Sequence, residues 1–163
     1  MIRIVVCSLL GSAFLFAAAP TPARSTTLDA TAVLKTFYTW YFRVPNHNWN
    51  GRFAEVKALF DPGLYAMLQT VVHKEARARE PIMDFDPFVN AQYDVTAYAL
   101  GTPVVKNSNV NVPVALTLYH GPNNKARLTA VLRKNAVGRY VIYNLVYDPK
   151  NNLRDLLRIW VKE

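Results

Sequence analysis

The sequence predicts an α+β fold in which helices cover one face of a curved antiparallel sheet. The N-terminal half carries apolar residues at helical spacing, at i, i+3, i+4 and i+7. After residue 92 the apolar period changes from 3.6 to 2, and short turns rich in Gly and Asn separate the alternating runs. A last helical pattern ends the chain. Helices, then a run of strands, then a helix is the order typical of α+β proteins.

Residues 1–23 have the features of a secretory signal. Arg3 supplies a positive end, residues 4–18 form an apolar run, and small residues follow up to Ala23. The run is shorter than the ~20 residues that a membrane-spanning helix needs. Cys7, the sole cysteine, precedes most of the run, whereas a lipid-anchor cysteine follows it. We therefore expect a periplasmic protein, cleaved near Ala23, with 24–163 as one domain and no transmembrane span.

The charge balance is basic. The chain has 19 Lys and Arg against 11 Asp and Glu, and removal of Arg3 with the signal leaves a net charge of +7. The basic residues are scattered without a run of five, which indicates a solvated surface rather than a nucleic-acid face. The sequence therefore predicts no nucleic-acid partner, and it leaves anionic lipid or cell-envelope polymer open.

The N-terminal half predicts three helices. Thr27 or Asp29 caps the first, which runs to about Val44 before Pro45. Its apolar face is unusually aromatic, and Trp40 widens it, so the helix is covered on more than one side or lines a cavity. A short helix is expected over 52–60. A longer one follows, capped by Asp61, ending near Arg79, with this buried face: Leu64, Met67, Leu68, Val71 and Val72.

The C-terminal half predicts an antiparallel meander. Strands are expected over 95–100 and 104–106, with a break between them, and then over 110–119, 127–134 and 140–147. Pro113 lies inside the third of these strands and indicates an edge or a bulge. A terminal helix then has Leu153, Leu156, Leu157 and Trp160 on one face.

Residues 84–92, which we call the 84–92 segment, combine two acids, two aromatics and two amides. Asp84 and Asp86 could form a general acid/base pair or supply oxygen ligands to a cation. Short acids beside Pro and Asn also cap turns by accepting backbone N–H bonds, and we favour this interpretation. Asn90 and Gln92 could present amides into a cavity or satisfy the loop backbone. The spacing of a Ca²⁺ loop is absent.

Other catalytic patterns are missing. The histidines His47, His73 and His120 lack the spacing of a helical metal site. The chain has neither a Gly-rich phosphate loop nor a Gly-x-Ser-x-Gly elbow, and cleavage of the signal removes the sole cysteine. The sequence therefore predicts no catalytic residue, cofactor or metal, and it favours a protein that is not an enzyme.

A family resemblance rests on the Phe37-Tyr38-x-Trp40-Tyr41 pattern, on the Asp84-Phe85-Asp86-Pro87-Phe88-x-Asn90-Ala91-Gln92 stretch, and on the order of elements. These resemble exported bacterial proteins catalogued as domain of unknown function thirty-eight twenty-eight, within the nuclear transport factor two-like superfamily. Over residues 28–160 the resemblance implies a cone-shaped α+β fold with a cavity between sheet and helices. It implies no activity, and the catalytic residues of the superfamily's enzymes do not match this chain.

The functional prediction is a non-catalytic envelope accessory protein that binds a small apolar ligand or a protein partner. Buried phenols need polar partners, so some of the many tyrosines should face a cavity or a partner. The candidate binding residues are Asp84, Asp86, Asn90, Gln92, Tyr38 and Tyr41. Two alternatives stay open. One is a small hydrolase, isomerase or dehydratase that uses Asp84 or Asp86 as a base in an apolar cavity. The other is a structural module that forms a homodimer through its open sheet.

Overall fold

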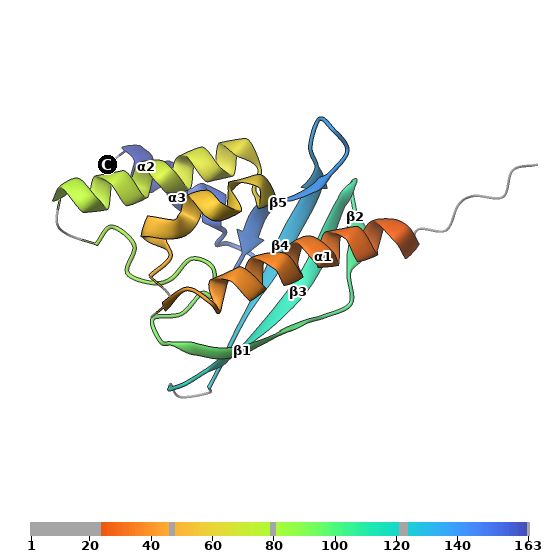
Figure 1. Cartoon of the computed structure of the whole chain (residues 1–163), viewed down its shortest axis with the longest axis horizontal. Helices are drawn as coiled ribbons and strands as arrows, with labels where there is room; N and C mark the ends of the chain where they lie inside the picture. Colours follow the sequence, from red (N-terminus) through yellow and green to blue (C-terminus); the bar gives the residue numbers. More distant parts are fainter. Residues whose placement is uncertain (1–23, 46–47, 79–80, 121–123, 163) are drawn as a thin grey trace, which may run out of the picture.

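Figure 1 shows the computed structural model, which describes residues 24–45, 48–78, 81–120 and 124–162. The predicted signal, residues 1–23, lies outside the described residues, as do His47 and the helix end expected at Arg79. The α+β prediction is confirmed, because the described residues form four helices and an open antiparallel sheet of five strands. The elements in chain order are α1 (Arg24–Tyr41), η2 (Asn50–Leu59), α2 (Pro62–Ala78), β1 (Val95–Leu100), β2 (Val104–Lys106), β3 (Asn109–Leu118), β4 (Lys125–Lys134), β5 (Tyr140–Val146) and α3 (Leu153–Lys162).

The sheet is a meander with the order β1-β3-β4-β5, and β2 pairs with β3 beyond the end of β1. The bounds of β1 and β2 match the prediction, and the other strands differ from it by one or two residues at an end. Asn107 and Ser108 form the turn between β2 and β3, with φ of 49° and 64°. Positive φ at both turn residues suits the twist of a two-residue hairpin.

Pro113 was expected to mark an edge or a bulge, and the edge alternative is wrong. It lies in β3, which is central in the sheet rather than at an edge. The pairing is irregular at this point, since residues 101–103 lie opposite only two residues of β3, 112 and 113. The Pro113 carbonyl accepts the Gly101 N–H at 2.8 Å, so it points toward the break between β1 and β2. In an antiparallel sheet the N–H and C=O of a residue point to the same side, so the N–H that proline lacks would also have faced this break. A Cβ on Gly101 would lie 3.0 Å from the Pro113 Cβ, so this close approach requires glycine. The broken neighbour is what allows a proline in a central strand.

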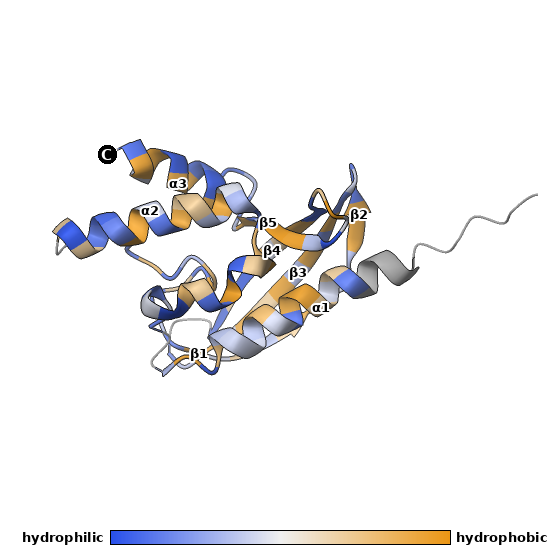
Figure 2. Cartoon of the chain, turned by 45° about the horizontal axis from the view of Figure 1, so that its top comes forward, coloured by the Kyte–Doolittle hydropathy of each residue, from blue (hydrophilic) through white to orange (hydrophobic). Residues whose placement is uncertain are grey.

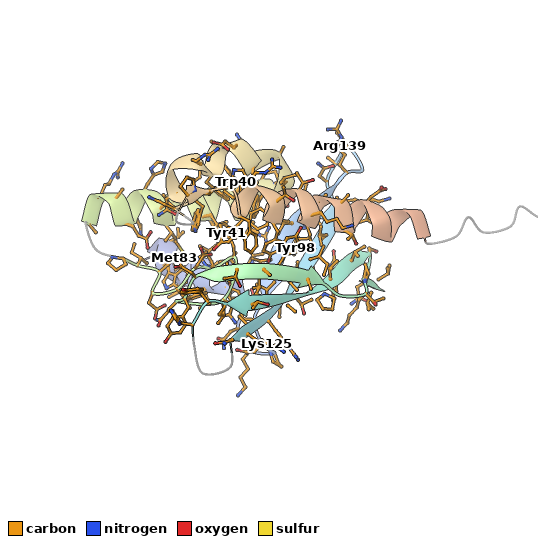
Figure 3. The ribbon with its side chains drawn as sticks, turned by 60° about the horizontal axis from the view of Figure 1, so that its bottom comes forward. Trp40, Tyr41, Met83, Tyr98, Lys125 and Arg139 are labelled. Atoms are coloured by element: carbon orange, nitrogen blue, oxygen red, sulfur yellow. The ribbon has the colours of Figure 1, made fainter. Side chains whose placement is uncertain are left out.

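The inner face of the sheet packs against α1 (Figures 1 and 3). Tyr38 stacks on Tyr98 of β1 with ring centroids 4.9 Å apart, and Phe37 meets Phe60 edge-on at 5.2 Å. These rings occupy space in which a cavity was expected between the first helix and the sheet. The α1 helix ends at Tyr41 rather than at Val44, because the following residues continue in i to i+3 turns. Its buried side chains are Ala30, Leu34, Phe37, Tyr38 and Tyr41.

Of the remaining helices, η2 packs against α1, and α2 and α3 pack against each other. The η2 segment is a 3₁₀ helix rather than the expected α-helix, since its apolar residues Phe53, Val56 and Leu59 recur every three residues. At the start of α2, the Asp61 Oδ1 accepts the N–H groups of Gly63 and Leu64, which confirms the predicted cap. The α3 helix packs beside α2 (Figure 1) and alternates hydrophilic and hydrophobic residues, whereas β3 and β4 are largely hydrophobic (Figure 2).

Candidate functional site

The 84–92 segment folds back on itself as a compact turn. The Asp86 N–H donates to the Ala91 carbonyl, and the Asn90 N–H donates to the Asp86 carbonyl, both at 2.9 Å. Asn90 takes a φ of 53°, in the left-handed region that Asn tolerates. Phe88, at the centre of the turn, is fully buried and lies 4.6 Å from the Trp49 ring and 5.1 Å from the Phe37 ring. The hydrophobic core thus anchors the segment.

The Asp86 carboxylate accepts hydrogen bonds from three parts of the chain. Its Oδ1 accepts the Phe88 N–H at 2.8 Å, which is the turn cap that the sequence predicts. Its Oδ2 accepts the Tyr41 hydroxyl at 2.9 Å and the Trp49 Nε1–H at 3.1 Å. Asp86 therefore ties the turn to the end of α1 and to the residue before η2. Each oxygen thus already accepts at least one hydrogen bond from within the chain, and a substrate would compete with those donors.

Two more tyrosines bind the backbone of the same turn. The Tyr38 hydroxyl donates to the Phe88 carbonyl at 3.0 Å, and the Tyr147 hydroxyl donates to the Pro87 carbonyl at 2.8 Å. Burial, reinforced by the negative charge of Asp86, raises the pKa of Tyr38, Tyr41 and Tyr147 well above the ordinary phenol range. These phenols stay protonated as donors at neutral pH.

The other predicted site residues lie at the surface of the segment. Asp84 is exposed and shares with Tyr41, Asp86 and Gln92 a shallow hollow of about 370 Å³. Asn90 and Gln92 line a second hollow of about 450 Å³, which we call the polar hollow. Tyr38 has no exposed surface. Asp86 also lines a third hollow, of about 500 Å³, beside Trp49. The structure thus brings most of the predicted residues together, but around three separate hollows rather than in one cavity.

A larger depression lies on the outer face of the sheet, opposite α1. We call it the sheet groove; its volume is about 670 Å³. It is lined by Ala99, Leu100, Gly101, Pro113, Val114, Ala115, Arg127, Leu128, Thr129, Val146, Tyr147, Asp148 and Pro149. Small side chains on neighbouring strands form its floor, since Ala99 pairs with Ala115, and Pro113 pairs with Thr129. The surface is mostly apolar, as in small-molecule sites of this size.

The sequence reasoning missed the sheet groove. Its signal was present at the outward positions of β1 and β3, where Ala97, Ala99 and Ala115 stand in place of the polar residues expected on a solvated face. Alternation identified these positions as the outer face. Only the strand register shows that the small residues lie side by side.

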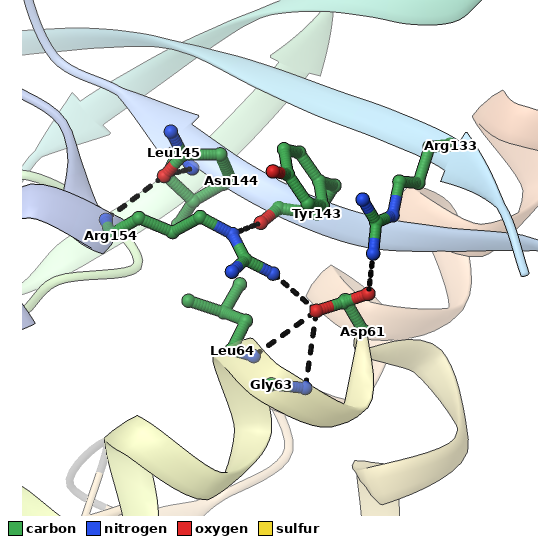
Figure 4. Close-up of polar contacts among 8 residues, drawn as sticks. All are labelled: Asp61, Gly63, Leu64, Arg133, Tyr143, Asn144, Leu145 and Arg154. Atoms are coloured by element: carbon green, nitrogen blue, oxygen red, sulfur yellow. Dashed lines mark hydrogen bonds and ion pairs between the residues drawn. The ribbon is translucent and has the colours of Figure 1, made fainter.

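A second polar cluster joins α2, β4 and α3 (Figure 4). Asp61, 5% exposed, pairs with Arg133 at 2.6 Å and with Arg154. The Tyr143 ring lies between the two guanidinium groups, 3.9 Å and 4.0 Å from their Cζ atoms. Burial tends to raise the pKa of Asp61, but hydrogen bonds from Arg133 and Arg154 outweigh it and hold the pKa below its usual value. The cluster is closed and braces the helices against the sheet.

The part of the chain that the structure describes contains no group of three or more His, Cys, Asp and Glu side chains suited to a metal ion. None of its described helices combines the length and apolar character needed to cross a bilayer. Comparisons of the chain with protein-family models, with curated proteins and with solved structures found no match. The family resemblance therefore stays a prediction.

Proposed function

We propose that this chain is an exported, non-catalytic binding protein of the nuclear transport factor two-like type, and that it holds a small apolar ligand in the sheet groove. One observation carries the proposal. At the groove, the outward residues Ala99 of β1 and Pro113 and Ala115 of β3 form an apolar floor where a solvated sheet face should be polar, and Tyr147 and Pro149 also line the groove. A ligand that covers this floor removes apolar surface from water, which favours binding.

The enzyme alternative has weaker support. Asp86 accepts hydrogen bonds on both carboxylate oxygens, so a role as general base would first require the loss of those bonds. Asp84 is exposed to solvent. Neither acid stands in the dry apolar pocket that this alternative requires. A binding role is therefore the better supported one.

The dimer alternative draws on the same surface. The apolar outer face extends beyond the sheet groove to the exposed Ala97, and at the sheet edge Val104 and Val105 are 57% and 54% exposed. A second copy could cover this area, as exposed sheet faces and edges allow. Size-exclusion chromatography with light scattering, with and without ligand, distinguishes the two. A monomer in both conditions favours the ligand, and a stable dimer favours the structural module.

Binding of Nile red, an uncharged apolar dye, tests the proposal. Ala99→Trp should fill the groove and abolish saturable binding, because Ala99 lines its floor. Ala97→Trp is the matched control, since Ala97 lies two residues away on the same strand face and outside the groove lining. The control should bind like the unmodified chain. Equal binding by all three proteins would contradict the proposal.

Export is tested separately. Cell fractionation with N-terminal sequencing should find the chain in the periplasm, beginning at Arg24. A cytoplasmic chain that retains residues 1–23 would contradict the localisation without affecting the groove.

A further inference from the structure

We infer that the ligand of the sheet groove is a small amphiphile with an acidic head group, and that Arg127 binds this head group. The inference rests on the proposed function, because it assumes a ligand in the groove. It adds the chemical class of that ligand. The key observation is that Arg127 lines both the apolar sheet groove and the polar hollow beside the 84–92 segment.

The strand register places Arg127 at the junction of these two depressions. Arg127 is exposed on the outer side of β4 and pairs with Ala115 of the groove floor. Lys125, two residues earlier, lies on the same side of β4. Figure 3 shows Lys125 on the side of the sheet opposite α1. A ligand that lies along the apolar floor therefore has basic side chains at one end.

The polar hollow is suited to an anion. Two cations line it, Lys125 and Arg127, together with the amides of Asn90 and Gln92, and none of the acids that the structure describes lines it. The remaining lining residues are Phe85, Ala91, Tyr93, Leu118 and Ala126. Amide N–H groups and a guanidinium are all hydrogen-bond donors, and the planar guanidinium matches a carboxylate through two parallel bonds.

Arg127 also differs from the arginines that brace the fold. Arg133 and Arg154 both pair with Asp61, whereas the side chain of Arg127 has no ion-pair or hydrogen-bond partner among the described residues. The one acid in the sheet groove, Asp148, accepts bonds from Lys150 N–H and from the N–H and side-chain amide of Asn151. Asp148 is committed to its own turn, so the donors of Arg127 remain available to a ligand.

Binding of decanoate and of 1-decanol, followed by NMR titration of the full chain, tests the inference. The two probes share an alkyl tail and differ in the acidic head group. Decanoate should bind roughly three- to tenfold more tightly than decanol, as a partly exposed charge-assisted contact implies. Arg127→Gln should remove this difference and leave decanol binding unchanged. Arg139→Gln, at an exposed arginine in the β4–β5 turn (Figure 3), is the control and should behave like the unmodified chain.

Each contrary outcome has a distinct meaning. If both probes bind equally, or if Arg127→Gln leaves decanoate binding unchanged, the inference is wrong while the proposed function stands. If neither probe binds and Nile red also fails to bind, the proposed function itself is wrong. Lys125→Gln should weaken decanoate binding by a smaller factor, and an effect larger than that of Arg127→Gln would overturn the assignment of Arg127.

Co-sedimentation with vesicles identifies the source of the head group. The inference concerns a free amphiphile. The unmodified chain and Arg127→Gln should therefore co-sediment to the same extent with anionic phosphatidylglycerol vesicles. Vesicle binding that is lost in Arg127→Gln, without binding of monomeric decanoate, would overturn the inference in favour of a membrane surface.

Discussion

The 84–92 segment and the sheet groove lie next to each other, and their polar groups are arranged in opposite ways. In the segment, Asp86 binds a backbone N–H, a phenol and an indole. In the groove, Arg127 has no such partner among the described residues, and its neighbours are mostly apolar. Tyr147 connects the two regions, because its hydroxyl binds the segment and the residue also lines the groove. In the 84–92 segment, the Asp86 carboxylate is therefore hydrogen-bonded within the chain. On the alanine-rich sheet face, the apolar surface and the Arg127 side chain are available to a ligand.

A motif rich in polar residues is not by itself a binding site. A polar group whose hydrogen bonds are complete within the chain contributes chiefly to stability, since new partners must displace the existing ones. A charged group beside apolar surface, with its donors unused, is available to a ligand. The following predictions test this division between stability and binding.

Substitution of Asp61 should have the largest effect, because Asp61 is the most buried acid described and pairs with two arginines. Asp61→Ala removes a helix cap and leaves Arg154, whose side chain is 12% exposed, without its carboxylate. The free energy of unfolding should fall by about 4 kcal/mol. Urea denaturation measures it. Asp155→Ala, at an exposed pair with Arg158, is the control and should cost under about 1 kcal/mol.

The same group makes stability depend on pH in a defined direction. The pKa of Asp61 is lowered in the folded protein, so its contribution is present above the unfolded carboxyl pKa of about 4 and is lost as the pH falls through the lower folded value. Asp61→Asn should flatten this acid limb of the stability curve. If Asp61→Asn lost stability at acid pH as steeply as the unmodified chain, other groups would be responsible for acid unfolding.

Asp86→Ala should lower the free energy of unfolding by about 3 kcal/mol, because the donors from Tyr41, Trp49 and Phe88 lose their acceptor. Asp84→Ala, at the exposed acid two residues away, should change it by less than about 0.5 kcal/mol. Chemical denaturation of both variants gives the comparison. A stable Asp86→Ala protein that had lost a measurable reaction would instead restore the enzyme alternative.

Alkaline pH should weaken the protein through its buried tyrosines. The folded pKa of Tyr41 is raised, first by burial and then by Asp86, so stability is lost as the pH rises above the unfolded phenol value of about 10. Each such tyrosine contributes a slope of up to about 1.4 kcal/mol per pH unit. Tyr41→Phe should reduce the total slope by up to that amount. Urea denaturation of both proteins at several pH values from about 9.5 to about 11, on both sides of the unfolded phenol pKa, measures the slopes. An equal slope in both proteins would show that Tyr41 ionises while folded.

Arg127→Gln should have the smallest effect on stability, within about 0.5 kcal/mol, because Arg127 is exposed and its side chain has no ion-pair or hydrogen-bond partner in the part of the chain that the structure describes. A thermal melt checks this. A large loss of stability would place Arg127 with Asp61 and Asp86 as a structural residue and would remove the contrast between the two regions.

The sequence predicted the fold class and most elements because these depend on local patterns. Alternation gave β1 and β2 their bounds, and the Asp61-Pro62 pair marked the start of α2. The edge alternative for Pro113 was wrong because the position of a strand within the sheet depends on strand order, which no local pattern contains. The end of α1 was predicted too late, because apolar residues continue past Tyr41 into a turn. Hydrophobic spacing alone does not distinguish such a turn from a helix.

The site was only partly predictable because its contacts are long-range. The turn cap by Asp86 follows from neighbouring residues, whereas its bonds to Tyr41 and Trp49 join residues that are 45 and 37 positions away. The partners of Asp61 are equally remote, with Arg133 and Arg154 coming 72 and 93 positions later. The sheet groove likewise depends on which outward side chains of β1, β3 and β4 face each other.

Intermolecular NOEs between decanoate and the chain show which of the two regions holds the ligand. Ligand tail protons should give NOEs to the methyl groups of Ala99 and Ala115, which lie side by side on the groove floor. Met83 and Tyr41, which line the hollow of the 84–92 segment, are the contrasting positions. NOEs to Ala99 and Ala115 alone would support an open sheet face as the binding site. NOEs to Met83 and Tyr41 instead would contradict the account and return the site to the acidic segment.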